Sequence, residues 1–200
     1  MQVSEAIETR RAIKQFDPEH RLSESEQDRL IELAMKSPTA FNLQHWRFVV
    51  VRDPAQRQAI REVAWDQAQV TDASMLIILC GRRDVWQTEA ERVWQGAPAE
   101  VQEMMHGAID AYYRDQPQVE RDEVMRSCGI AGQTLMLATR EMGLDSCPMD
   151  GFDFDAVGRL IGLPDDHVIS FMVAIGKKAA DVWPRPGQLA IDDVRLVDRF

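Results

Sequence analysis

Three basic side chains lie within five positions near the N-terminus, at Arg10, Arg11 and Lys14. A guanidinium group offers a fork of donors and an ammonium group offers a compact charge, so both suit a phosphate or an anionic ring edge. The same residues stand at the end of a predicted helix, where cations are stabilised by the helix dipole. Taken alone, the cluster therefore fits anion binding and a structural ion pair equally well.

The helix that leads into this cluster is predicted from apolar spacing. Val3, Ala6, Ile7 and Arg10 fall on one helical face. A guanidinium buried on that face would require a partner.

A second candidate segment is the polar loop at residues 37–46. Pro38 ends the preceding helix, and an apolar strand follows from Trp46. The side-chain amides of Asn42 and Gln44 could recognise the edge of a heterocycle. Alternatively, they merely cap the backbone of the loop, and for the loop taken alone this alternative is favoured.

Two further segments are weak candidates by themselves. Asp66, Gln67 and Gln69 come just before a buried strand, and residues 147–152 form a turn after a short strand. Gly151 in that turn would let a flat ring approach the backbone closely.

The elements that must position these segments follow from caps and periodicity. A capping box at Ser23–Glu26 opens a helix that should end near Ser37, and Asp53-Pro54 starts another helix after a strand at 46–51. Residues 74–80 and 168–175 are continuously apolar, which predicts strands buried on both faces.

The second half of the chain is predicted to hold two long helices, at 98–115 and 120–142. The second is apolar nearly all round, so we expect a central, buried helix whose glycines serve close packing. A short strand follows at 144–147. The tail from Lys177 is irregular and admits a last strand at 193–197. The pattern predicts one α+β domain over residues 1–200, a sandwich of helices around one sheet.

Bulk properties exclude several classes of function. The formal net charge of −10 disfavours nucleic acid and anionic membranes as partners. Cys80, Cys128 and Cys147 are too scattered for disulfides or zinc, and no signal peptide or membrane span is evident, so a cytoplasmic protein is expected. The four histidines show no metal-ligand spacing, and no nucleotide-binding glycine motif occurs.

Four ordered segments resemble the nitroreductase family of flavin enzymes. Residues 10–16 resemble its Arg-Arg-Ser-Ile-Arg-x-Phe/Tyr opening, and residues 37–48 its Pro-Ser-x-x-Asn-x-Gln-Pro-Trp-x-Phe loop. Residues 143–152 resemble its Gly-x-x-x-x-Pro-x-x-Gly-Phe segment, and residues 174–177 its closing Ile-Gly-Lys strand. The resemblance covers essentially the whole chain.

The resemblance implies a homodimer with a central, mainly antiparallel sheet and two FMN molecules at the subunit interface. The implied FMN-binding residues from one chain are Arg10, Arg11, Ala12, Lys14, Asp66, Gln67, Gln69, Pro148, Met149, Asp150 and Gly151. Pro38, Thr39 and Asn42 would come from the other subunit. A basic tail residue would reach the phosphate, with Arg185 preferred and Lys177 and Lys178 as rivals.

The sequence departs from the family pattern at three positions. Ala12 replaces the usual serine, His45 replaces a proline, and Asp66 replaces an asparagine. An anion at Asp66 would sit poorly beside a reduced, anionic flavin.

The activity implied is an FMN-dependent oxidoreductase. NADH or NADPH would pass a hydride to flavin N5, and a nitroaromatic or quinone would then replace it in the same pocket, so no acid–base side chain is named as catalytic. The alternatives are other flavin chemistry, such as ring fragmentation or dehalogenation, and a flavin-binding or flavin-free sensing protein. The helix 98–115, with Met105, Tyr112 and Tyr113, either covers the pocket or simply packs as an ordinary helix.

Overall fold

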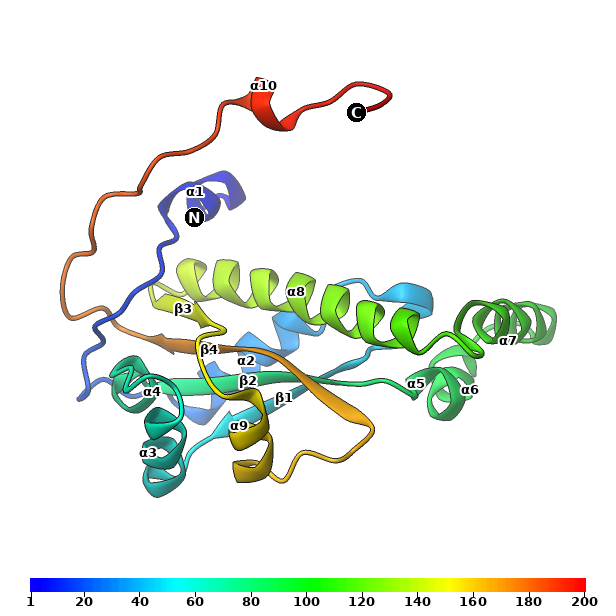
Figure 1. Ribbon diagram of the computed structural model, residues 1–200, viewed down its shortest axis with the longest axis horizontal. Coiled ribbons are helices and arrows are strands. Elements are labelled where there is room, and N and C mark those ends of the chain that lie inside the picture. The colour runs from blue at the N-terminus through cyan, green and yellow to red at the C-terminus, as the bar shows by residue number, and fades with distance from the viewer.

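Four strands form one sheet in the order β1-β2-β4-β3, and every neighbouring pair is antiparallel. The computed structural model covers residues 1–200 and gives the strands as β1 (Trp46–Val51), β2 (Met75–Arg82), β3 (Asp145–Met149) and β4 (His167–Gly176). Helices lie on both faces of the sheet (Figure 1). The predicted α+β sandwich around a mainly antiparallel sheet is therefore confirmed.

Eleven helical segments surround the sheet. They are α1 (Val3–Thr9), α2 (Glu24–Ala34), the 3₁₀ turn η1 (Ala40–Asn42), α3 (Pro54–Glu62), α4 (Gln69–Asp72), α5 (Val85–Thr88), α6 (Ala90–Trp94), α7 (Ala99–Tyr113), α8 (Pro117–Glu141), α9 (Phe154–Leu160) and α10 (Ile191–Val194). Helices α2 and α8 cover one face of the sheet and α3 and α9 the other (Figure 1). None of these helices combines the length and the hydrophobicity that a membrane crossing requires.

The two central strands are buried on both faces, as predicted. In β2, Leu76 and Ile78 belong to a core cluster of 17 residues, whereas Ile77 and Leu79 belong to a second cluster of 16 residues. Alternation along a strand sends neighbouring side chains to opposite faces, so an unbroken apolar run fills two cores.

The predicted helix caps are present. Ser23 Oγ accepts from the Glu26 amide at 3.3 Å, and the Glu26 carboxylate accepts from the Ser23 amide at 2.8 Å. Asp53 Oδ1 accepts from the Ala55 amide at 2.7 Å at the start of α3. Helix α2 ends at Ala34, before the predicted Ser37, because residues 35–37 continue only as a hydrogen-bonded turn.

Helix α8 differs in part from its prediction. A side chain at Gly132 would collide with the ring of Phe171, which confirms close packing there, whereas Gly129 faces open space. Ile130 is 43% exposed. The prediction that this helix is buried all round is therefore wrong for a single chain, since its outer face is uncovered.

The two ends of the chain also differ from their predictions. Helix α1 stands off the sheet, so Val3 and Ile7 are exposed and Arg10, just beyond the helix, is only half-buried (Figure 1). The tail forms the helical turn α10 where a strand at 193–197 was considered. It runs away from both edges of the sheet, and a strand with no neighbouring edge has no partner for its backbone groups.

Candidate functional site

The cationic segment at residues 10–14 runs alongside β3. Ala12 and Ser146 form a parallel bridge, and the Ile13 amide donates to the Ser146 carbonyl at 3.1 Å. Ile13 is buried in the core, so its neighbours Ala12 and Lys14 point outward. The backbone pairing thus fixes which side chains of this segment face solvent.

Gln67 joins three of the four candidate segments. Lys14 Nζ donates to Gln67 Oε1 at 3.5 Å, and Gln69 Nε2 donates to the same oxygen at 2.9 Å. Gln67 Nε2 donates to the carbonyl oxygen of Gly151 at 2.9 Å. The structure therefore brings Lys14 of the cationic segment, the segment 66–69 and the turn at Gly151 together at one point.

The cations near β3 have no carboxylate partner. Arg10, Arg11 and Lys14 form no ion pair, and the guanidinium of Arg11 donates to the Trp183 carbonyl. Burial raises the pKa of the Cys147 thiol, while the charges of Lys14 and Arg10 act in the opposite direction. A structural ion pair therefore does not explain this cluster, and its positive field remains available to an anion.

A residue that sequence reasoning missed, Trp65, borders the turn at Gly151. A side chain at Gly151 would lie 2.6 Å from Trp65 Cζ3. The flat ring that approaches this glycine is thus an indole of the protein itself. Trp65 is 79% exposed and has a left-handed backbone, with φ of 54°. A large aromatic residue next to Asp66 in a polar segment was the signal that could have identified it.

The other residues of the turn and of the segment 66–69 are placed around this junction. Asp66 pairs with Arg61 at 2.6 Å, which offsets the anion that the sequence puts there. Met149 is buried, Pro148 is half-buried and Asp150 is exposed.

The loop at residues 37–45 has an unusual backbone. Phe41, Asn42 and Gln44 have φ values of 50°, 57° and 53°, a region that residues other than glycine seldom adopt. Thr39 Oγ1 accepts from the Gln44 amide at 2.9 Å, and Trp94 Nε1 donates to the Phe41 carbonyl at 3.0 Å. No hydrogen bond to another residue occupies the side-chain amides of Asn42 and Gln44, so capping of the loop does not explain them.

This loop is far from the cationic segment within one chain. The loop leads into Trp46 of β1, which pairs with Gly81 of β2, and Gly81 pairs in turn with Val168 of β4. The cationic segment instead pairs with Ser146 of β3, which lies opposite Ile175 of β4. Val168 and Ile175 are seven positions apart along β4, or roughly 23 Å of extended strand. Figure 1 likewise shows α4 and α7 at opposite ends of the sheet. A single chain therefore does not bring Pro38, Thr39 and Asn42 to Lys14.

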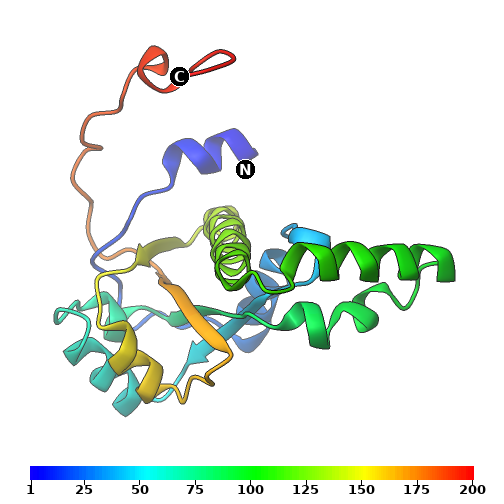
Figure 2. The same ribbon diagram turned by 45° about the vertical axis from the view of Figure 1, so that its right-hand side comes forward.

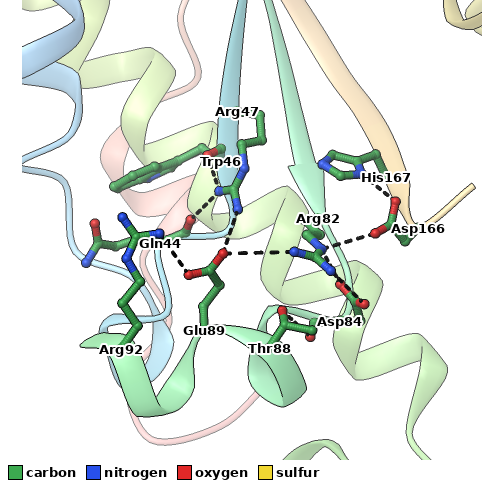
Figure 3. Close-up of polar contacts among 10 residues, drawn as sticks. All are labelled: Gln44, Trp46, Arg47, Arg82, Asp84, Thr88, Glu89, Arg92, Asp166 and His167. Atoms are coloured by element: carbon green, nitrogen blue, oxygen red, sulfur yellow. Dashed lines mark hydrogen bonds and ion pairs between the residues drawn. The ribbon is translucent and has the colours of Figure 1, made fainter. Parts of the chain in front are cut away.

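A network of charged residues fixes the start of β1 next to this loop (Figure 3). Arg47 Nη1 donates to the Gln44 carbonyl at 3.2 Å, and Arg47 Nη2 lies 3.7 Å from Glu89. Glu89 also faces Arg82 at 3.9 Å, and Arg82 reaches Asp166 at 3.1 Å. The loop end is thus tied to α6 and, through Arg82, to the start of β4.

The tail candidates lie near the cationic segment but differ in their contacts. The Arg185 guanidinium donates to the carbonyl oxygens of Glu8 and Arg10, at 3.0 and 2.8 Å. Lys178 pairs with Asp181 at 3.0 Å, and Lys177 is exposed. The cationic segment and tail residues between 180 and 186 together line a cavity of about 300 Å³.

Helix α7 extends beyond the sheet (Figure 2). Tyr113 is fully buried and Tyr112 is 41% exposed, while Met105 is half-buried. Tyr113 belongs to a third core cluster of six residues, together with Leu43 and Trp86. Tyr113 is thus a core residue of this end of the molecule, whereas Tyr112 is partly exposed and donates its hydroxyl to Glu123 Oε1 at 2.8 Å.

Comparison with known proteins identifies the family of this chain. The family model described as Nitroreductase family matches residues 7–177. Protein DrgA of Synechocystis is 49% identical over 181 residues, covering 90% of this chain and 86% of that protein. NADH dehydrogenase of Thermus thermophilus is 34% identical, covering 78% of this chain and 77% of its own. A protein of Exiguobacterium sibiricum solved in complex with FMN superposes with a TM-score of 0.87 at 25% identity, covering 99% and 98% of the two chains. The chain belongs to the nitroreductase family.

Proposed function

We propose that this protein is an FMN-dependent oxidoreductase that takes reducing equivalents from NADH or NADPH and passes them to flat acceptors such as nitroaromatics or quinones. The observation that carries the proposal is the junction at Gln67, where unpaired cations meet the turn at Gly151. Family membership and the FMN complex of a structural relative support the cofactor.

The residues at the junction fit FMN. Arg10, Arg11 and Lys14 lack carboxylate partners, so they can accept an anionic phosphate or flavin edge without breaking an ion pair. Gln67 and Gln69 offer amides to the polar edge of the ring. When bound, FMN supplies the redox chemistry by accepting a hydride and passing it on, and the protein supplies placement and electrostatics.

The other predicted site residues have narrower roles in this proposal. Ala12, Asp66, Pro148, Met149 and Asp150 border the junction and shape the space beside the ring. Ala12 offers only its backbone, because it lacks the hydroxyl usual in the family. Arg185 is our choice for the phosphate, with Lys177 and Lys178 as rivals. Arg185 is favoured because it already lies at the Arg10 carbonyl, 2.8 Å away.

We further propose a homodimer with composite sites, to which the loop of one copy contributes Pro38, Thr39 and Asn42. Two observations support it. The loop lies too far from Lys14 in its own chain, and exposed apolar groups lack a cover, including Ile130 on α8 and Leu189 and Val197 in the tail. Exposed apolar residues of this number favour a protein interface, and a two-fold pair would form both sites at once. An obligate interface of this kind should bury more than roughly 2,000 Å².

The visible spectrum of the purified protein tests the proposal. We expect a yellow protein with one FMN per chain, released on denaturation. NADH should bleach it without oxygen, and a quinone should restore the colour. Double-reciprocal plots with NAD(P)H and a quinone should give parallel lines, because donor and acceptor use one pocket in turn. A colourless protein that does not take up added FMN would overturn the proposal.

A further inference from the structure

His45 stands where the family pattern has proline, and the structure buries it completely. His45 Nε2 lies 3.2 Å from the Tyr113 hydroxyl, and Nδ1 lies 3.0 Å from Ser127 Oγ. His45 and Tyr113 are 0% exposed, and Ser127 is 1% exposed. Each ring nitrogen therefore has one hydroxyl partner in a dry environment, as a buried imidazole requires.

The backbone of His45 is held by the sheet while its side chain holds two helices. The Arg82 amide of β2 donates to the His45 carbonyl at 2.9 Å. Tyr113 is the last residue of α7, and Ser127 lies in α8. His45 is thus the point at which the sheet, α7 and α8 are connected by hydrogen bonds.

The segment just before His45 depends on the same helix. Leu43 shares the small core cluster of Tyr113, and the ring of Phe41 lies 5.5 Å from that of Tyr112 and 6.2 Å from that of Tyr113. Three residues of this segment hold left-handed backbone conformations, which persist only when surrounding contacts impose them. A change at the His45–Tyr113 contact must therefore reach the loop.

We propose that His45 is a positioning residue: through Tyr113 and Ser127 it holds residues 38–44 in the conformation that presents Thr39 and Asn42 to the flavin site of a second copy. The inference rests on the proposed function. It gives the histidine at this position a role that proline cannot perform, because a proline ring has no side-chain donor or acceptor. The contact between His45 and Tyr113 also couples the position of α7 to the loop.

The first test needs no flavin. Amide hydrogen exchange on the flavin-free protein should show faster exchange at Asn42, Leu43 and Gln44 in His45→Ala, whereas the amides at the centre of β2, at Ile77 and Ile78, keep wild-type rates. These three loop amides are hydrogen-bonded in the structure. In His45→Gln, the amide keeps one donor and one acceptor, and we expect it to restore most of the protection.

The second test measures FMN affinity by flavin fluorescence. Loss of the buried hydrogen bonds in His45→Ala should raise the Kd for FMN roughly tenfold, with His45→Gln close to wild type. Tyr113→Phe should show a similar rise, and the double variant should not add the two effects, because both remove the same contact.

Thr139→Ala is the matched control. Like Ser127, Thr139 is a buried polar residue of α8, but its hydroxyl donates only within the helix, to the Leu135 carbonyl at 2.8 Å. Even if Thr139→Ala lowers the melting temperature as much as His45→Ala does, it should leave amide exchange in the loop and FMN affinity unchanged. Unchanged loop exchange in His45→Ala, or equal effects of Thr139→Ala, would overturn the positioning role. A wild-type protein that binds no FMN would instead overturn the proposed function, and the exchange experiment would still decide the role of His45.

Discussion

The side-chain amide of Gln67 donates a hydrogen bond to the carbonyl oxygen of Gly151 at 2.9 Å, although 84 residues separate them in the chain. The same side chain accepts from Lys14 and from Gln69 through Oε1. One glutamine therefore sets the relative positions of the turn after β3 and the cationic segment beside β3.

Replacing Gln67 should loosen this junction. Gln67→Ala removes a donor and a shared acceptor, and each lost hydrogen bond contributes about 1 kcal/mol. We expect FMN affinity to fall roughly tenfold, measured by fluorescence titration. Gln67→Glu loses the donor to Gly151 and gives Lys14 a carboxylate partner, so it should bind FMN more weakly than Gln67→Ala. Equal affinity in all three proteins would show that the junction does not position the cofactor.

The unpaired cations should bind the anionic part of the cofactor. Arg10→Ala and Lys14→Ala should each weaken FMN binding by about 1.5–3 kcal/mol, the usual contribution of a charge-assisted contact. Isothermal titration measures the affinities for FMN and for riboflavin, which lacks the phosphate. Replacing a residue that binds the phosphate should weaken FMN binding and leave riboflavin binding unchanged. Arg29→Ala is the control, because Arg29 is exposed and pairs with Glu32 at 3.5 Å. Variants that hold FMN as tightly as this control would contradict the assignment.

The contact between Gly151 and Trp65 should be steric. Gly151→Ala places a methyl group 2.6 Å from Trp65 Cζ3, which is closer than van der Waals contact allows, and overpacking costs about 1–3 kcal/mol. Because Trp65 is exposed, Trp65→Ala should remove most of that cost in the double variant. Chemical denaturation measures the four free energies of unfolding. Additive effects would mean that the glycine is required for another reason.

Acid should destabilise the protein partly through His45. Burial lowers the pKa of His45 from 6.5 to about 4, so the unfolded chain takes up this proton before the folded one does. Stability is then unaffected above about pH 6.5 and falls as the pH drops towards 4, by about 3 kcal/mol for this group. Urea unfolding at pH 7 and pH 4 gives the free energy of unfolding of wild type and of His45→Gln. The difference between the two proteins isolates the contribution of His45, because all other groups titrate in both. A difference between the two proteins that stays constant with pH would contradict it.

Composite sites predict complementation between inactive variants. Arg10→Ala and Asn42→Ala, unfolded together and refolded with FMN, should form heterodimers with one intact site and regain part of the NADH:quinone activity. Each variant refolded alone is the control. If heterodimers form and the mixture stays inactive, both residues serve the same site within one chain.

The sequence by itself determined the family, the four strands of the sheet and the longer helices, but not the short helices α4, α5, α6, α9 and α10. Local signals suffice for the family and the longer elements: the Ser23 and Asp53 caps, the apolar runs of β2 and β4, and four ordered motifs are all contained in short windows. Cofactor chemistry followed from the resemblance that those motifs carry.

Only the tertiary structure decided which candidate residues meet. The Gln67–Gly151 contact, the indole of Trp65 beside Gly151 and the burial of His45 between two helices all join residues distant in the chain or depend on a left-handed backbone. The structure of the C-terminal tail was likewise decided by tertiary contacts and not by its local sequence. The residues at 193–197 suit a strand, but strand formation needs a neighbouring edge, and in this structure the tail reaches none and turns into α10 instead.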